Sequence, residues 1–194
     1  MKEVRYIKKH KIILLIGASG SGKSTIGKAL EDRFIPQLIS YTTRPIREGE
    51  IEDEDYYFTN KDWLNKFTRD NDIAERTTYD GNEYGLFCIE IERVIEQGDA
   101  YFVCNKDGAE QIIDIYGSDV IPFWLNVDEE TMRYRMGKRG DSEQSINARV
   151  EHAKENNELE SPDFEHIEMD AGLEIEEQLN IILNTLSYKK ENIN

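Results

Sequence analysis

The stretch "GASGSGKST", residues 17–25, has the pattern G-x-x-x-x-G-K-[ST] in full. Residues 12–16 before it are a continuous apolar run, which predicts a strand buried on both faces. The residues after it predict a helix with an apolar face at Ile26, Ala29, Leu30 and Phe34. A glycine-rich turn between a buried strand and a helix is the context in which this pattern holds a phosphate.

The chemistry expected of this loop follows from its residue types. Its glycines let the backbone curl until successive N–H groups converge on one phosphate, and the helix N-terminus adds a favourable potential for an anion. We predict that Lys23 reaches the outer phosphates of a nucleoside triphosphate and that the Ser24 hydroxyl binds Mg²⁺. The predicted triphosphate-binding residues are Gly17, Ala18, Ser19, Gly20, Ser21, Gly22, Lys23, Ser24 and Thr25. The alternative, a flexible Gly/Ser turn, fits the strand–loop–helix context poorly.

Length, charge and cysteine spacing exclude several classes of partner and site. The 194 residues suffice for one domain with a sizeable core, and the net charge is −16, from 24 basic and 40 acidic side chains. Such a surface repels nucleic acid and anionic membranes, so the charge argues against both as partners and means that any anion site must be built locally. The phosphate loop predicts small-molecule nucleotides as the partners. Cys88 and Cys104 have no metal or disulfide spacing, and the N-terminal apolar run is too short for a signal peptide or membrane span. We therefore expect a cytoplasmic protein, with its oligomeric state left open.

Strands and helices alternate along most of the chain, which predicts an α/β fold with a parallel sheet flanked by helices. Further strands are predicted at residues 37–43, 100–104, 120–127 and 164–169, and helices near 91–97, at 129–140, from about 142, and over 175–186. Residues 41–87 differ, because they are rich in Asp, Glu, Thr, Tyr and Gly and poor in apolar residues. We predict that they form a small inserted subdomain with strands, within a core made of residues 1–40 and 88–194.

A second informative stretch is "SYTTRPIREGEIEDEDYYF", residues 40–58, where two arginines precede a run of acids. It has the form S-x-T-T-R-x-x-R-x-G-E followed by D-Y-x-F. Glu75 then precedes G-N-x-Y-G at residues 81–85, and three arginines follow at Arg135, Arg139 and Arg149. Together with the phosphate loop, these motifs resemble the guanylate kinase family in order and nearly in spacing, from about residue 12 to residue 186.

The resemblance implies a P-loop NTPase core, a helical lid at about residues 133–149, and an inserted subdomain that binds a nucleoside monophosphate. It implies phosphoryl transfer from ATP, with Mg²⁺, to GMP or dGMP. The acceptor-binding residues that it implies are Ser40, Arg44, Arg47, Tyr56, Glu75, Tyr84 and Asn105. The arginines and tyrosines would hold the acceptor phosphate, and Glu75 would accept from the N1–H and N2–H₂ edge of guanine, with Ser40 on the O6 side.

The catalytic residues that the resemblance implies are Lys23, Arg135, Arg139 and Arg149. Phosphoryl transfer spreads negative charge over the moving group, so positioned cations in a closed site can supply most of the catalysis. A simpler interpretation stays open for the arginines, namely surface ion pairs that have no part in the reaction. Such pairs would join Arg44 and Arg47 to Glu48 or Glu50, and Arg135 and Arg139 to Glu129, Glu130 or Asp141.

Several positions depart from the family pattern. Ala18 replaces a proline, the lid is one residue short, and Leu86 replaces the Ser or Thr that helps to hold guanine. Val103 and Asn105 replace two acids that serve the metal's water shell and the acceptor base or ribose, and Asp107 would share the face of Asn105 if the strand continued. Two alternatives to a GMP kinase therefore stay open: a kinase of another phosphorylated ribose compound, and a non-catalytic guanylate-kinase-like binding or sensor module.

Overall fold

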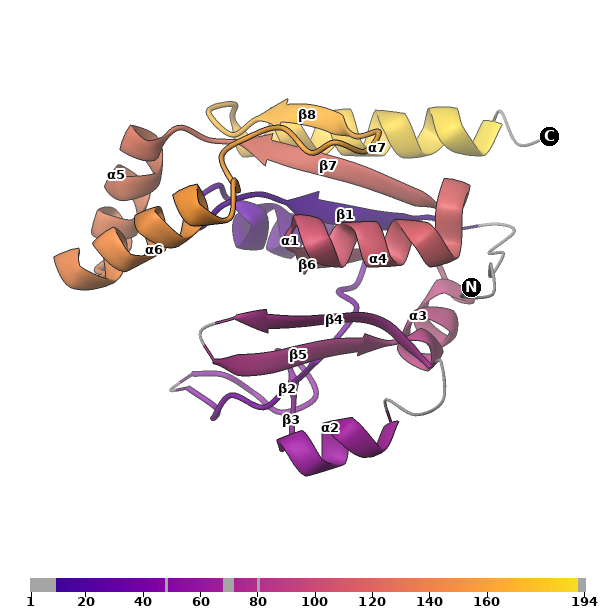
Figure 1. Cartoon of the computed structure of the whole chain (residues 1–194). Helices are drawn as coiled ribbons and strands as arrows, with labels where there is room; N and C mark the ends of the chain where they lie inside the picture. Colours follow the sequence, from indigo (N-terminus) through magenta and orange to yellow (C-terminus); the bar gives the residue numbers. More distant parts are fainter. Residues whose placement is uncertain (1–9, 48, 68–71, 80, 192–194) are drawn as a thin grey trace.

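The structure, a computed structural model, describes residues 10–47, 49–67, 72–79 and 81–191. These residues form two four-stranded sheets, which lie one above the other in Figure 1. The upper sheet is parallel throughout, in the order β6-β1-β7-β8. Its strands are β1 (Ile12–Ile16), β6 (Ala100–Cys104), β7 (Val120–Asn126) and β8 (Ile167–Asp170). The predicted α/β fold with a parallel sheet is confirmed.

The central strand β1 is buried on both faces, as its uninterrupted apolar sequence predicts. Helices α1 (Lys23–Glu31) and α7 (Ile175–Glu191) cover one face of the sheet, and α3 (Cys88–Ile95) and α4 (Lys106–Tyr116) cover the other. Successive strand residues point to opposite faces, so Ile13 and Leu15 pack toward α1 and α7 while Leu14 packs toward α3 and α4. This alternation divides the core into two apolar layers.

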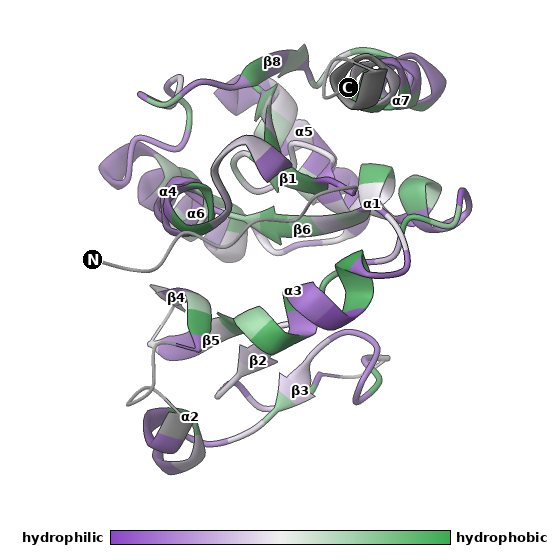
Figure 2. Cartoon of the chain, turned by 90° about the vertical axis from the view of Figure 1, so that its right-hand side faces the viewer, coloured by the Kyte–Doolittle hydropathy of each residue, from purple (hydrophilic) through white to green (hydrophobic). Residues whose placement is uncertain are grey.

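Hydropathy follows this layering. Figure 2 shows apolar residues gathered on β1 and β6 and on the parts of the helices turned toward the sheet. Polar residues cover the outward parts of the same helices, the pattern expected of amphipathic helices packed on a sheet. No helix in the described part of the chain is long and apolar enough to cross a membrane.

The lower sheet is mixed, in the order β3-β2-β5-β4. Its strands are β2 (Tyr41–Thr42), β3 (Tyr57–Phe58), β4 (Ile73–Tyr79) and β5 (Asn82–Phe87), and α2 (Lys61–Phe67) follows β3. Aromatic rings form much of its packing: the ring centroid of Tyr41 lies 4.6 Å from that of Tyr57, 4.9 Å from that of Trp63 and 4.7 Å from that of Phe87. Large rings thus let a segment with few aliphatic residues pack. We keep as a proposal that residues 41–87 form an inserted domain.

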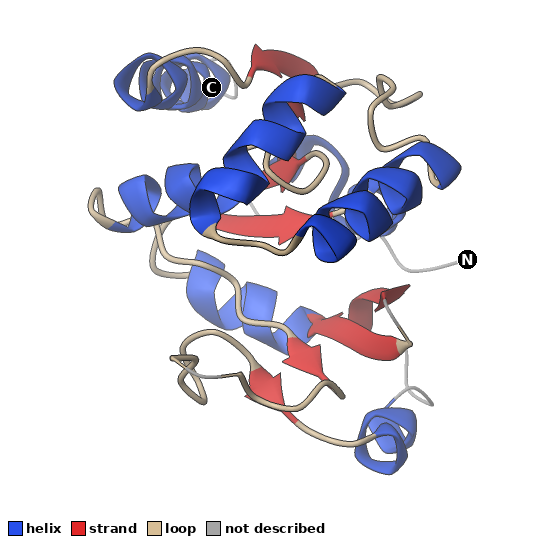
Figure 3. Cartoon of the chain, turned by 90° about the vertical axis from the view of Figure 1, so that its left-hand side faces the viewer, coloured by secondary structure: helices blue, strands red, loops and turns tan. Residues whose placement is uncertain are grey.

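Two helices, α5 (Glu129–Arg139) and α6 (Glu143–Glu155), project from the carboxyl end of the parallel sheet, and Figure 3 views the molecule from that end. We call them the α5–α6 pair. Each begins at a side-chain cap, since Asp128 accepts a hydrogen bond from Thr131 N at 2.6 Å and Ser142 accepts one from Ser145 N at 3.2 Å. Gly140, with φ of 95°, ends α5 in a left-handed conformation and lets the chain turn back.

Two details of the predicted elements are wrong. Helix α1 ends at Glu31, so Phe34 is not on its buried face; its φ is 61° and its side chain is 94% exposed. The strand predicted over residues 37–43 is only β2, in the lower sheet. Strand β6 ends at Cys104, as predicted, so the condition for Asp107 to share the face of Asn105 is not met, and Asp107 lies in the first turn of α4. Helices α2 and α4 were not among those predicted.

Candidate active site

A cleft of about 300 Å³ opens between the two sheets, at the carboxyl end of the parallel strands, and we call it the inter-sheet cleft. Open α/β sheets bind ligands at this end because the loops that follow the strands converge there. The lining residues are Gly17, Ser19, Lys23, Ser40, Arg44, Arg47, Tyr56, Glu75, Thr77, Tyr84, Phe102, Val103, Cys104, Asn105, Arg149 and Glu158. All seven residues predicted to bind the acceptor are therefore brought to one cleft, although they come from segments far apart in the chain.

A second cleft, of about 360 Å³, lies between the phosphate loop and the α5–α6 pair, and we call it the loop cleft. Its lining residues are Ser19, Gly20, Gly22, Lys23, Ser24, Thr25, Arg135, Met136, Arg139 and Arg149. Ser19, Lys23 and Arg149 line both clefts. A phosphate in the loop cleft would thus lie next to a group held in the inter-sheet cleft, with the cations of Lys23 and Arg149 between them.

The shape of the phosphate loop depends on two of its glycines. Gly22 has φ of 102° and is the N-cap of α1, a left-handed conformation that side chains disfavour. Gly17 follows β1 so closely against β7 that an added Cβ would lie 2.8 Å from the carbonyl oxygen of Leu125. Glycine at these positions lets the loop turn from the strand into the helix, which leaves the N-terminus of α1 facing the loop cleft.

Lys23 is folded back over the phosphate loop. Its Nζ donates hydrogen bonds to the carbonyl oxygens of Gly17 at 2.5 Å and Ala18 at 2.9 Å. Burial lowers the pKa of Lys23 to about 8, and the nearby carboxylate of Glu158 opposes this shift. Its third acceptor is the Ser21 Oγ atom at 3.5 Å, so all three partners in these contacts are uncharged. A phosphate would offer Lys23 a negatively charged partner in their place.

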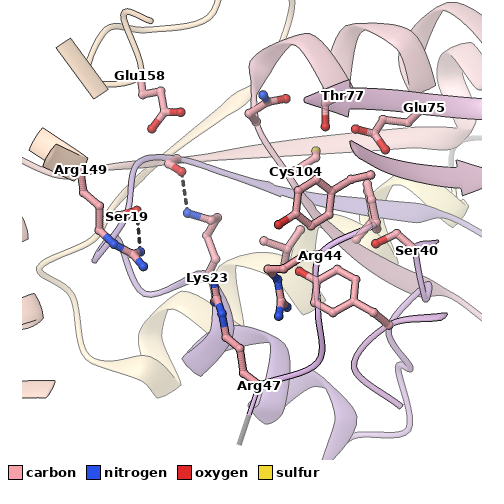
Figure 4. A pocket seen from close by; sticks show the side chains of 16 residues that line it. Ser19, Lys23, Ser40, Arg44, Arg47, Glu75, Thr77, Cys104, Arg149 and Glu158 are labelled. Carbon is pink, nitrogen blue, oxygen red and sulfur yellow. Dashed lines mark hydrogen bonds between the residues drawn. The ribbon is translucent and has the colours of Figure 1, made fainter. Parts of the chain in front are cut away.

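The three predicted catalytic arginines have different partners. Arg135 donates to the carbonyl oxygens of Gly20 at 3.2 Å and Ala171 at 2.6 Å, so it ties α5 to the phosphate loop and is not paired with Glu129 or Glu130 in these contacts. Arg149 Nη1 donates to Ser19 Oγ at 3.4 Å (Figure 4). Arg139 is more than half exposed and pairs with Asp141, which is the surface pairing that the sequence left open.

Arg44 is 7% exposed and also has a carboxylate partner, so the alternative of an ion pair is realised here too. Both of its Nη atoms donate to Glu50 at 2.8 Å, and its guanidinium carbon lies 5.3 Å from the ring centroid of Tyr56. The same guanidinium lines the inter-sheet cleft together with the exposed Arg47. The ion pair and a role in the cleft are thus compatible, because Glu50 holds the planar group in one orientation. The Tyr56 hydroxyl stays protonated, since burial raises its pKa.

Glu75 is the buried carboxylate of the inter-sheet cleft, with 3% of its surface exposed. It interacts with the Thr77 hydroxyl and the backbone N–H of Leu86, yet burial still raises the pKa of Glu75 to about 7. Its Oε2 atom has no hydrogen-bond partner among the described residues. A buried acceptor without a partner is costly, so an N–H group that donated to Oε2 would stabilise this carboxylate.

Asn105 and Val103 line the inter-sheet cleft where the family pattern has acids. The Asn105 Oδ1 atom accepts from Gly108 N at 2.9 Å and so caps α4. This capping bond explains why β6 stops at Cys104, and it leaves the amide nitrogen of Asn105 as the group that can donate to a ligand.

The sequence analysis missed three polar lining residues: Thr77, Cys104 and Glu158. Thr77 lies two residues after Glu75 in a strand, so alternation could have placed it on the same face had β4 been predicted. Glu158 follows the end of α6 and reaches Lys23 only through the packing of α6 against the core. No local pattern marks that position.

Lys23 and Arg149 thus join a cleft at the phosphate loop to a cleft for a second ligand, and comparison with known proteins finds a family with a matching sequence. The sequence model of the guanylate kinase family matches residues 9–186. The chain belongs to the guanylate kinase family. Its fold and its family are those of a nucleoside monophosphate kinase.

Curated members of the family resemble the chain over about three quarters of its length. The guanylate kinase of Lactococcus lactis is 33% identical over 149 residues, which cover 74% of this chain and 72% of that protein. That of Enterococcus faecalis is 32% identical over 139 residues, covering 70% and 68%. Among solved structures, guanylate kinase from Anaplasma phagocytophilum superposes with a TM-score of 0.72 at 24% identity, covering 94% of this chain and 87% of that one.

Proposed function

We propose that this member of the guanylate kinase family transfers the γ-phosphoryl group of ATP to GMP or dGMP, giving ADP and GDP or dGDP. One observation supports this most: the phosphate loop meets the inter-sheet cleft at Lys23 and Arg149. That cleft also holds Arg44, Arg47 and a buried carboxylate whose Oε2 atom has no hydrogen-bond partner among the described residues. A triphosphate and a monophosphate bound in the two clefts would have their reacting groups side by side, and positioning is the main requirement of phosphoryl transfer.

On the acceptor side, charge and hydrogen bonding divide the inter-sheet cleft into two halves. Arg44, Arg47, Tyr56 and Tyr84 form the half that would grip the acceptor phosphate, because guanidinium groups and hydroxyls donate to its oxygens. Glu75 forms the other half, where its carboxylate would accept from N1–H and N2–H₂ of guanine. Adenine has no hydrogen on N1, so it would leave this carboxylate unpaired. We place Ser40 on the O6 side, with Asn105 donating through its amide nitrogen.

On the donor side, the phosphate loop would hold ATP, and cations would stabilise the charge that develops on the moving phosphoryl group. Lys23 would bridge the outer phosphates, and Arg149 would approach from α6. Arg135 would stabilise the same charge while its hydrogen bonds to the phosphate loop hold α5 in place. Arg139 would first have to leave Asp141, which a movement of the α5–α6 pair could bring about.

Mg²⁺ belongs to this proposal as a companion of ATP. In the described part of the chain, no three His, Cys, Asp or Glu side chains gather where they could hold a metal ion. Mg²⁺ does not depend on such a cage, because it keeps several waters and binds through one or two protein oxygens and substrate phosphates. The exposed Ser24 hydroxyl lines the loop cleft in the first turn of α1, so the residues present fit the ion. When bound, Mg²⁺ would neutralise phosphate charge during transfer.

We further propose that three units move around the substrates: the core of residues 1–40 and 88–194, the lid at about 133–149 within that range, and the inserted residues 41–87. Closure of the two smaller units would bring the clefts together and exclude water. A net charge of −16 disfavours nucleic acid and anionic membrane surfaces as partners, so we propose small-molecule nucleotides as the partners and a cytoplasmic location. The proposal includes no oligomeric state.

The function is tested by measuring ADP formation from ATP and Mg²⁺ with a panel of acceptors: AMP, GMP, dGMP, CMP, UMP and ribose phosphates. We expect turnover on GMP and dGMP and background rates on the rest. Turnover confined to a sugar phosphate would reassign the acceptor to another phosphorylated ribose compound. Measurable GMP binding with no turnover on any acceptor would make the protein a binding or sensor module.

Arg44→Ala is expected to raise the KM for GMP about 10–100-fold, because it removes charge-assisted hydrogen bonds to the acceptor phosphate. The KM for dGMP should rise by a similar factor, since both acceptors carry the same phosphate. Steady-state kinetics with saturating ATP measures both values, and a thermal melt checks that the fold survives the loss of the partner of Glu50.

The matched control is Arg93→Ala. Arg93 also pairs with a glutamate through two nitrogens, at 2.8–3.1 Å from Glu90, but it lines neither the inter-sheet cleft nor the loop cleft. We expect its KM for GMP to equal that of the unmodified protein. An Arg44→Ala protein that folds and keeps an unchanged KM for GMP would refute the phosphate-binding role.

A further inference from the structure

Leu86 removes a hydroxyl from the base end of the inter-sheet cleft. The family pattern has Ser or Thr at this position, directly after Tyr84 and Gly85, whereas Leu86 is fully buried in the apolar layer next to α3 and α4. The carboxylate of Glu75 lies opposite Leu86 in the register of β4 and β5. Leu86 does not line the inter-sheet cleft, so a base held by Glu75 would meet no hydroxyl from this position.

Thr77 brings a hydroxyl to the same end of the cleft from the neighbouring strand. Glu75 and Thr77 are two residues apart on β4, so their side chains point to one face, and both line the inter-sheet cleft (Figure 4). Thr77 pairs across the sheet with Tyr84, which lines the cleft as well. The Thr77 hydroxyl also lowers the pKa of Glu75, so the two side chains interact as well as sharing a face.

We propose that Thr77 is a specificity-determining residue, whose hydroxyl donates to Glu75 and accepts from the N2 amine of the acceptor guanine in place of the hydroxyl that Leu86 lacks. This inference rests on the proposed function, because it concerns the base that the inter-sheet cleft binds. It assigns to β4 a recognition task that the family pattern gives to β5.

Hydrogen-bond chemistry gives each of the two groups its direction. An ionised carboxylate can only accept hydrogen bonds, so the Thr77 hydroxyl would donate its single hydrogen to Glu75. Its lone pairs would then remain available to accept a hydrogen bond from the base. The N2 amine of guanine has two hydrogens, one for Glu75 and one for Thr77. Hypoxanthine keeps O6 and N1–H but has no amine at C2. Thr77 therefore contributes to recognition of GMP and not to that of IMP.

The surroundings of Glu75 confine its carboxylate to this arrangement. On the side of α4, Gly108 packs so closely that an added Cβ would lie 3.0 Å from Glu75 Oε1. The titratable and charged side chains that line the same cleft are Lys23, Arg44, Arg47, Tyr56, Tyr84, Cys104, Arg149 and Glu158. Thr77 is the uncharged donor that shares a strand face with Glu75.

The test compares Thr77→Val, which keeps the shape and removes the hydroxyl, with Thr77→Ser, which restores a hydroxyl. Thr78→Val, at an exposed position on the same strand, is the matched control. Binding of GMP and of IMP is measured by calorimetry without ATP, and kcat/KM for both is measured with ATP and Mg²⁺. Thr77→Val is expected to lower the preference for GMP over IMP about 10-fold, the worth of one hydrogen bond, while Thr77→Ser and Thr78→Val keep it.

A second measurement follows the GMP affinity against pH. Thr77 helps to hold the Glu75 carboxylate ionised, so in Thr77→Val the fall in GMP affinity on acidification should begin at a higher pH than in the unmodified protein. A residue that served only to pack the strand would not move this profile. An unchanged preference for GMP over IMP in a folded Thr77→Val protein would overturn the proposal.

Failure of the proposed function is distinguishable from failure of this inference. If the unmodified protein binds GMP without transferring a phosphoryl group to it, the kinase proposal fails, and the calorimetric comparison of GMP with IMP still decides the role of Thr77. If it does not bind GMP at all, both proposals are overturned.

Discussion

Lys23→Ala should lower kcat for GMP phosphorylation by about 10²–10³-fold, the usual cost of removing one preorganised charge from a transfer site. The structure explains the size of the effect. Lys23 stands where the two clefts meet and donates to loop carbonyls that a bound phosphate can replace as its partners. The measurement is single-turnover transfer from ATP at saturating GMP, which separates the chemical step from substrate binding.

The control for this substitution is Lys28→Ala, because Lys28 lies exposed on the same helix α1 and lines neither the inter-sheet cleft nor the loop cleft. We expect its transfer rate to be unchanged. The KM for GMP should change little in Lys23→Ala, since the acceptor phosphate is held by Arg44 and its neighbours. A variant that keeps its transfer rate would show that Lys23 is a structural lysine that only braces the loop.

Glu75→Gln should have opposite effects on activity and on stability. It keeps the size of the side chain but places an amide N–H₂ where guanine needs two acceptors, so kcat/KM for GMP is expected to fall about 100-fold. The same change removes a buried carboxylate that lacks a partner at Oε2 and has a pKa raised to about 7. The free protein should therefore gain stability at pH 8.

The direction of the stability effect follows from proton linkage. The pKa of Glu75 in the folded protein, about 7, lies above the ordinary value of 4.5, so the folded state binds more protons than the unfolded state between these values. Stability falls as the pH rises from 4.5 to 7, by at most about 3 kcal/mol, and the loss is complete above pH 7. Glu75→Gln removes this loss, so its gain should be near zero at pH 5 and about 1–3 kcal/mol at pH 8.

Urea unfolding at pH 5 and pH 8 measures this difference. Glu90→Gln is the matched control, because Glu90 is also buried but is paired with Arg93, and its substitution should destabilise the protein at both pH values. A Glu75→Gln protein that is less stable than the unmodified protein at pH 8 would contradict the claim that the buried Glu75 carboxylate destabilises the free protein. GMP should restore stability to the unmodified protein far more than to the variant.

Local patterns in the sequence were sufficient to predict much of the core and the donor site. The apolar run at residues 12–16 predicted the doubly buried strand β1, and the glycines and Lys23 after it predicted a phosphate loop. Ser142 is the N-cap of α6 because its hydroxyl binds an N–H three residues away. Each of these features depends on neighbours in the chain, which is why a single sequence reveals them.

Other features of the site depend on residues that meet only in the folded protein. Arg149 reaches Ser19, and Glu158 approaches Lys23, because α6 packs beside the phosphate loop. Whether Arg44 is a surface charge or lines a cleft depends on how the lower sheet is placed against the upper one.

The base end of the inter-sheet cleft shows most clearly which features follow from the sequence and which follow only from the tertiary structure. The resemblance of the sequence to the family pattern was enough to predict Glu75 as a base-binding residue and to mark the missing hydroxyl at Leu86. Only the pairing of β4 with β5 decided that Leu86 enters the apolar core and that Thr77 stands beside Glu75. The physical reason is strand register: side chains alternate between faces, so a shift of one residue would turn Thr77 away from the cleft.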